Sequence, residues 1–253
     1  NSTLSPLPWE RKSQGFRPIA VPAGIKEQLL EAAAKAPAVT GLQAYSVIII
    51  EDMKQRRLLS QACREPSCLL DAPLVAAFCV DTYRIKHLLQ EYQQDFFLGN
   101  PLGLLLGICD AMAAAQNMAL AAGSRGLATT YINPLLKDPN SIKEILKLPE
   151  YVFPVTILCL GYPLADDQEQ QGTGKILHKD YYHLPNKEEI AEFIKDNQHL
   201  FQNGALEPHD VKAIFESKGS QIWKALQESG FLPGEGIKEE GEIPGPGVGA
   251  LNP

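Results

Sequence analysis

The longest apolar stretch of the chain runs from Leu104 to Gly123 and fits one continuous helix. The polar residues that interrupt it are Asp110, Gln116 and Asn117. A helix that is apolar on nearly every face must be surrounded by protein. We therefore predict a core helix over 104–123, which ends where Gly123 and Gly126 permit a left-handed backbone.

Apolar runs elsewhere predict the strands and the remaining helices. Runs rich in β-branched and other apolar residues predict strands over 45–51, 72–81, 127–133 and 153–163. The second and fourth runs are apolar almost without interruption, which is typical of strands buried on both faces. Apolar residues at helical spacing predict helices over 25–36, 54–62, 84–97, 141–147, 188–201 and 211–229.

Composition divides the chain into three parts. Residues 1–9 form an arm with Pro and Ser, residues 10–202 form the main domain, and residues 203–253 form an extension with one helix and a tail rich in Gly and Pro. The arm and the tail are too poor in periodic apolar residues to fold alone. We expect their larger apolar side chains to lie against a partner subunit; these are Leu4, Leu7, Trp9, Phe231, Leu232 and Ile237.

The charge of the chain separates it from proteins that bind polyanions. The 253 residues carry a formal net charge of −7, and the basic residues cluster only at Lys54 to Arg57. We therefore expect neither nucleic acid nor an anionic membrane as a partner. The polar residues in the middle of the core helix would be costly in lipid, so we also expect no membrane span.

The five cysteines favour a reducing compartment. Their number is odd, and three of them lie inside apolar runs, where a free thiol behaves as a small hydrophobic side chain. Cys63 and Cys68 are close in sequence but have no nearby Cys or His pair to complete a metal site. We expect a cytoplasmic protein that holds no metal.

Several segments carry a recognisable combination of residues in a fixed order. They are the basic segment 11–13, the helix and loop 29–43, the strand 71–81, the segment 110–126, Tyr131-Ile132 at a strand end, and 148–163. Together they resemble the nitroreductase family of FMN flavoproteins, most closely its oxygen-insensitive NAD(P)H nitroreductase and flavin reductase branch. The resemblance implies an α+β sandwich with a mostly antiparallel central sheet flanked by helices. It also implies an intertwined homodimer with two FMN sites at the subunit interface.

The chemistry of FMN points to candidate site residues. Its phosphate needs cations and amides, the pyrimidine edge of its ring needs polar groups, and its open face must admit a hydride. Arg11, Lys12 and Ser13 are the candidates for the phosphate; the alternative is a solvated charged arm. Thr40 and Gln43 are the candidates for the ring. The resemblance adds Glu65, Tyr131, Ile132, Asn133 and Lys175.

The chain departs from the family pattern at some of these positions. The loop after Ala36-Pro37 reads Ala38-Val-Thr-Gly-Leu-Gln43 where the family usually has Ser-Ser-Gly-Asn-Leu-Gln. Asn133-Pro134 stand where the family commonly has two glycines, and Pro has no amide to offer. Tyr131 is equally suited to a core position.

The resemblance predicts an FMN-dependent NAD(P)H oxidoreductase. NAD(P)H and then a nitroaromatic, quinone or flavin-type acceptor would react in turn, by ping-pong hydride transfer that requires no catalytic side chain. One alternative is a divergent protein of the same fold with weakened or lost flavin use, acting in binding or regulation. Another is a flavin enzyme of this fold with a specialised substrate, such as a dehalogenase or a dehydrogenase.

Overall fold

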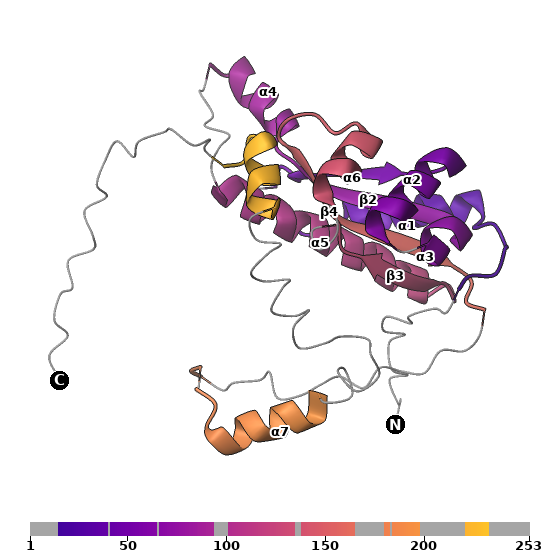
Figure 1. Cartoon of the computed structure of the whole chain (residues 1–253). Coiled ribbons are helices and arrows are strands. Elements are labelled where there is room, and N and C mark those ends of the chain that lie inside the picture. Colours follow the sequence, from indigo (N-terminus) through magenta and orange to yellow (C-terminus); the bar gives the residue numbers. More distant parts are fainter. Residues whose placement is uncertain are drawn as a thin grey trace, which may run out of the picture.

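The computed structural model of the chain describes residues 15–39, 41–64, 66–93, 101–134, 138–164, 180–182, 184–197 and 221–232. Within them, a four-stranded antiparallel sheet has the order β1-β2-β4-β3 (Figure 1). Its strands are β1 (Tyr45–Ile49), β2 (Leu74–Asp81), β3 (Ala128–Ile132) and β4 (Val152–Gly161). The predicted α+β fold with an antiparallel central sheet is confirmed.

Every residue of the two central strands, β2 and β4, is buried, whereas the edge strands β1 and β3 are half-buried. A helix layer covers each face of the sheet, so neither face of a central strand is exposed to solvent. The uninterrupted apolar runs predicted this arrangement correctly. The predicted strand over 153–163 is shorter in the structure because β4 ends at Gly161.

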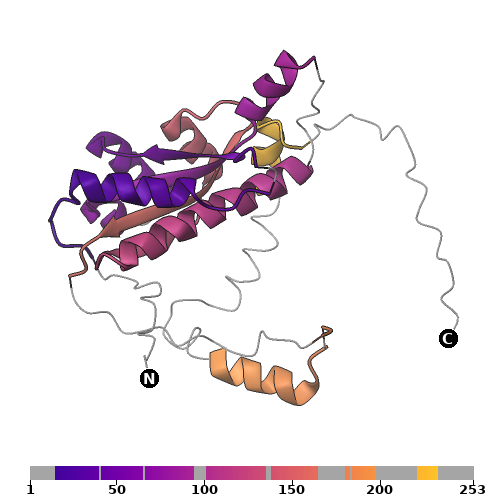
Figure 2. The ribbon, with the colours of Figure 1, turned by 180° about the vertical axis from the view of Figure 1, so that it is seen from behind.

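Helices cover both faces of the sheet. Those that pack on it are α1 (Ala23–Ala34), α2 (Met53–Cys63), α3 (Pro66–Asp71), α5 (Pro101–Gly123) and α6 (Pro139–Leu146). The helix α4 (Tyr83–Glu91) follows β2, and α7 (Lys187–Asn197) lies apart from the sheet (Figure 1). One apolar cluster joins α1 and α5 to the sheet, and a second joins α2, α3 and α6 to its other face. Figure 2 shows α1 and α5 side by side in front of the sheet, and Figure 1 shows the other layer.

Local signals explain where these helices begin and end. The Asp52 carboxylate accepts a hydrogen bond from the Lys54 amide, and the Asp138 carboxylate accepts one from the Ser141 amide, so each caps a helix start. Arg64 and Lys147 close α2 and α6 in the left-handed conformation. The sequence prediction missed α3, because a six-residue helix is too short to display a period.

Within a single chain the core helix α5 is covered on one side only. Its side chains pack on α1 and on the sheet, but Leu105 is 59% exposed and Met112 is 40% exposed on the opposite side. By length and composition α5 is also long and apolar enough to cross a membrane, a test that core helices of soluble proteins pass as well. In this fold α5 lies against β2 and β4 of its own chain.

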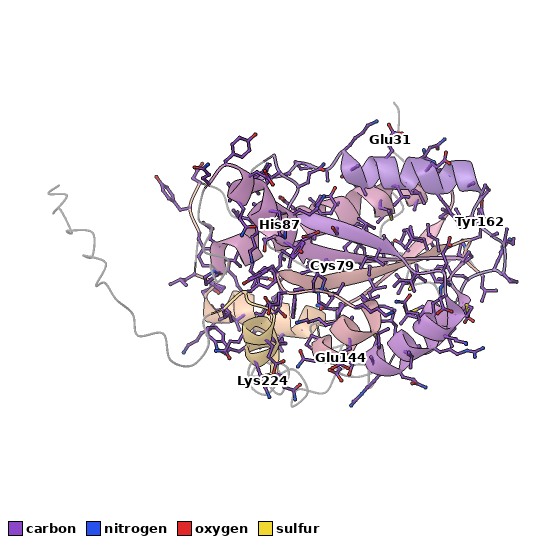
Figure 3. The ribbon with its side chains drawn as sticks, turned by 90° about the horizontal axis from the view of Figure 1, so that it is seen from above. Glu31, Cys79, His87, Glu144, Tyr162 and Lys224 are labelled. Carbon is purple, nitrogen blue, oxygen red and sulfur yellow. The ribbon has the colours of Figure 1, made fainter. Side chains whose placement is uncertain are left out.

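The segment 221–232 packs on the same chain rather than reaching elsewhere. Phe231 is fully buried edge-on against Phe153, with ring centroids 6.5 Å apart. The Tyr151 amide donates to the Ser229 carbonyl at 2.8 Å, which adds a backbone tie to the strand end. Figure 3 shows the helix that carries Lys224 beside α6.

The prediction that Phe231 and Leu232 would be covered by a partner subunit is therefore wrong in this structure, because the start of β4 offers an apolar surface within the chain. The other arm and tail residues of that prediction, Leu4, Leu7, Trp9 and Ile237, lie outside the described residues.

Close approach between α5 and the sheet generates a stability prediction. A Cβ at Gly107 would stand 2.0 Å from a Val80 methyl and 2.9 Å from the Ala44 carbonyl oxygen, so Gly107→Ala should destabilise the fold by roughly 1 to 3 kcal/mol. Gly103→Ala in the same helix meets only ordinary contact at 3.8 Å, and should stabilise by about 0.5 to 1 kcal/mol. Denaturant unfolding would measure both; equal midpoints for the two variants would contradict this packing.

Candidate functional site

The segment between α1 and β1, residues 35–44, is the α1–β1 loop, and its middle and its last residue are tied to one buried carboxylate. Asp110 of α5 is 1% exposed, and its two oxygens accept hydrogen bonds from the Val39 amide at 2.9 Å and the Ala44 amide at 3.1 Å. Hydrogen bonds to an ionised acceptor are stronger than neutral ones. The core helix thus sets the separation of two points five residues apart in the loop.

A second charged side chain holds the end of the loop from α4. Arg84 donates to the Gln43 carbonyl at 3.1 Å and to the Tyr45 carbonyl at 2.6 Å. Its own position is fixed by the Asp81 carboxylate, which lies 3.2 Å from the Arg84 Nε. Asp81 is buried and also accepts from the Ser46 hydroxyl. The start of β1 is therefore held through both its amides and its carbonyls.

Gln43, a predicted ring contact, has an unusual backbone conformation and lies between the residues that these hydrogen bonds hold. Its φ is +51°, in the left-handed region that non-glycine residues seldom occupy. Its side-chain Nε2 donates to the Ala34 carbonyl at 2.7 Å, which joins the loop to the end of α1. Strained backbone of this kind often marks functional positions.

Tyr45 continues the attachment of β1 to α1. Its hydroxyl donates to the Ala33 carbonyl at 3.0 Å. Burial, followed by the negative charge of Asp110, raises the pKa of Tyr45, while the Arg84 charge opposes the shift. The hydroxyl therefore stays protonated, and remains a hydrogen-bond donor, throughout the neutral range.

The predicted residues at the end of β3 have different surroundings. The Tyr131 hydroxyl donates to the Gln116 Oε1 of α5 at 3.0 Å. The Ile132 side chain is buried among α2, α3 and α6, and its carbonyl accepts from the Thr156 hydroxyl at 3.1 Å. Asn133 is exposed. Ile132 thus has a core role through its side chain, and Tyr131 packs half-buried against the other apolar cluster, on the side of α5.

The remaining predicted site residues cannot be placed. They are Arg11, Lys12, Ser13, Thr40, Glu65 and Lys175, all of which lie outside the described residues. Their roles stay predictions.

The fold does not bring Gln43 and Asn133 together within one chain. Gln43 precedes β1 and Asn133 follows β3, and these two strands form opposite edges of the sheet. Three strand spacings, or about 14 Å, separate the two edges. The helix α5 contacts both regions, through Asp110 and Gln116. These two residues lie six positions apart, or about 9 Å along the helix axis.

Sequence reasoning did not identify Asp110, Arg84 or Gln116 as part of this site. The available signal was the presence of polar residues inside an apolar helix, which was interpreted as evidence against a membrane span. Arg84 had no comparable signal, because charged residues are ordinary in an amphipathic helix.

The described residues provide hydrogen-bonding groups and open backbone rather than a nucleophile. A Cβ at Gly41, where φ is +73°, would meet nothing within 4 Å, so a ligand can approach that backbone closely. Burial and the Asp81 charge raise the pKa of Cys79 to about 12, and the thiol lies within the sheet (Figure 3). Contact with Cys68 and burial also raise the pKa of Cys159. Among the described residues, no group of three His, Cys, Asp or Glu could hold a metal ion.

Comparison with solved structures shows the fold. The chain is similar to the NfrA1 nitroreductase from B. subtilis, with a TM-score of 0.76 and 24% identity over 87% of this chain and 95% of that one. It is also similar to the NADPH:FMN oxidoreductase from Vibrio harveyi in complex with NAD+, with a TM-score of 0.75 and 24% identity over 87% and 94% of the two chains.

Sequence comparison shows the family. An NADPH-dependent oxidoreductase from Staphylococcus epidermidis (strain RP62A) is 33% identical over 193 residues, which cover 68% of this chain and 75% of that protein. Residues 11–162, more than half of the chain, match the Nitroreductase family. This span includes the α1–β1 loop, the core helix and all four strands. The chain belongs to the Nitroreductase family and is an oxidoreductase.

Proposed function

We propose that this protein is an FMN-dependent oxidoreductase that takes a hydride from NADPH or NADH and passes electrons to a nitroaromatic, quinone or flavin-type acceptor. The α1–β1 loop carries the proposal, because the buried Asp110 carboxylate fixes the loop at Val39 and at Ala44. Between these two points Gly41 is exposed and Gln43 is half-buried. The names of the Staphylococcus relative and of the Vibrio neighbour support NADPH and FMN as reaction partners.

The donor set of the chain fits FMN. Gln43 uses its Nε2 on Ala34, which leaves its amide oxygen to accept from a ring N–H, and Thr40 would add a hydroxyl. Arg11, Lys12 and Ser13 would hold the phosphate. Bound FMN supplies the capacity to accept and donate a hydride.

Other residues would complete the cofactor site. Asn133 and the Tyr131 hydroxyl would border the ring from the end of β3, with Glu65 and Lys175 as further polar contacts. The Ile132 side chain would support this strand end from the core. The protein's task in such a site is to bind and orient the two reactants rather than to supply an acid or base.

A homodimer would bring the separated halves of the site together. Gln43 and Asn133 lie at opposite sheet edges of one chain, and a second copy packed against α5 could place its α1–β1 loop beside the β3 end of the first. The exposed side of α5 suits this contact, because four large apolar side chains, spaced by three, seven and eight residues, lie on one face of the helix. These are Leu102, Leu105, Met112 and Leu120, here called the α5 stripe.

The first prediction concerns flavin affinity. The purified protein should bind about one FMN per chain. Gln43→Gly removes the side-chain contacts but relieves the left-handed strain, so stability should change by less than about 1 kcal/mol while FMN affinity falls about tenfold or more. Fluorescence titration and thermal unfolding would measure the two effects.

Lys147→Gly is the matched control. Lys147 has a φ of +53° at the end of α6 and makes no part of the proposed site, so this variant should gain stability and bind FMN as the wild type does. Absence of FMN binding by the wild type at high micromolar concentration would overturn the proposed cofactor and favour the divergent alternative.

The second prediction concerns kinetics. If NADPH and the acceptor bind in turn at one open site, initial rates measured at several fixed acceptor concentrations should give parallel double-reciprocal lines. Menadione and a nitroaromatic are suitable acceptors. Intersecting lines would indicate that both substrates bind together, and would exclude the ping-pong order.

The third prediction concerns the dimer. Light scattering should give about twice the chain mass of 27.7 kDa. Leu105→Glu buries a charge in the contact and should raise the dimer dissociation constant about 100-fold or more, whereas Leu58→Glu, at a residue 51% exposed on α2, should leave it unchanged.

The reactivity of the Cys109 thiol provides a second measurement of dimer formation. Cys109 is exposed in the single chain and lies on the same face of α5 as the α5 stripe, between Leu105 and Met112, so a dimer would protect it from an aromatic disulfide reagent. The reaction of Cys109 should therefore be slow in the wild type and fast in Leu105→Glu. A stable wild-type monomer with a fast-reacting Cys109 would disprove the shared site.

A further inference from the structure

Two side chains of opposite charge, from two different helices, fix the end of the α1–β1 loop. Asp110 of α5 binds the amides of Val39 and Ala44, and Arg84 of α4 binds the carbonyls of Gln43 and Tyr45. The Ala44 carbonyl in turn accepts from the Asp81 amide at 2.9 Å. Hydrogen bonds therefore fix the backbone both before Gln43, at Val39, and after it, at Ala44 and Tyr45.

A carboxylate is the side chain that this arrangement requires. Two amide N–H groups point at Asp110, and an ionised Asp offers two acceptor oxygens and no donor. An Asn of the same shape offers one oxygen, and its NH₂ would face one of the two loop amides. Replacing Asp110 by Asn therefore tests the acceptor chemistry while the volume of the side chain is kept.

The position of Asp110 is costly unless it serves the loop. It lies on the buried side of α5, next to Ala111 and in the same packed layer as Ala114. A buried charge is unfavourable unless it is paired or well hydrogen-bonded, and an apolar residue would suit this helix face better for stability alone. The two hydrogen bonds to loop amides compensate the burial and simultaneously set the loop geometry.

Arg84 binds the same end of the α1–β1 loop from the solvent-exposed side. Its side chain is 60% exposed, so it adds little to the core. It nevertheless donates to the carbonyls of Gln43 and Tyr45, which lie two residues apart. Asp81 keeps the guanidinium in place and is itself held by the Ser46 hydroxyl and the Tyr83 amide. The exposed position makes Arg84 replaceable without loss of the fold.

We propose that Asp110 and Arg84 are positioning residues, which set the backbone of the α1–β1 loop so that Gln43 and Gly41 are presented to the flavin without themselves touching it. This inference rests on the proposed function. It extends that function to residues of two helices that pack behind the loop.

Flavin titration provides the first test. Asp110→Asn should weaken FMN binding about tenfold or more. Arg84→Met, which removes the donors but keeps the length, should act in the same direction, and Arg84→Lys should be intermediate because one cation remains. Asn117→Ala is the matched control on α5, because Asn117 donates to the Ala32 carbonyl of α1 and not to the loop; its FMN affinity should equal that of the wild type.

Hydrogen exchange on the flavin-free protein provides a second test. The Val39 and Ala44 amides should exchange faster in Asp110→Asn than in the wild type, while amides of β2 and β4 should keep their protection. Thermal unfolding of the Asn117→Ala and Arg84→Met variants would separate a loop effect from general destabilisation.

The outcomes distinguish the two levels of the proposal. If the wild type takes up no FMN, the proposed function falls, and the cofactor part of this inference falls with it. If the wild type binds FMN and both Asp110→Asn and Arg84→Met bind it equally well, the proposed function stands and the positioning role is overturned. Unchanged exchange at Val39 and Ala44 in Asp110→Asn would also overturn it.

Discussion

One buried carboxylate links the core helix of this protein to the loop that precedes its first strand. Asp110 satisfies two amides of the α1–β1 loop from a position inside the packed layer between α1, α5 and the sheet. The loop geometry therefore depends on the position of α5. That position depends in turn on close packing, because Gly107 lies directly against Val80 and the Ala44 carbonyl.

Burial of the central strands determines where chemistry can take place. Because β2 and β4 are covered on both faces and hold thiols such as Cys79 and Cys159, they offer no accessible polar group. Accessible polar groups occur where the chain leaves the sheet, at the start of β1 and at the end of β3. Among the described residues the two edges of the sheet are thus the places where polar groups are accessible, and the helix α5 contacts both edge strands.

The sequence predicted the parts of the fold that depend on local patterns. Uninterrupted apolar runs identified β2, β4 and α5, and helical spacing identified α1 and α2, to within a few residues. The partners of Asp110 were not predictable in this way, because Val39 and Ala44 lie 71 and 66 residues away in the sequence. Phe231 illustrates the same limit. Its Gly- and Pro-rich surroundings predicted that a partner subunit would cover it, but Phe153 of its own chain packs against it.

The helix α5 has two functions that its all-round apolar sequence conceals. One side holds Asp110 and packs on α1 and the sheet, and the other side presents the α5 stripe to solvent in the single chain. Asp110 on the buried side is directly flanked by Cys109 on the exposed side. A second copy packed on the stripe would therefore press on the same helical turn that holds the loop, so that assembly and loop geometry would be coupled through one rigid element rather than through a separate pathway.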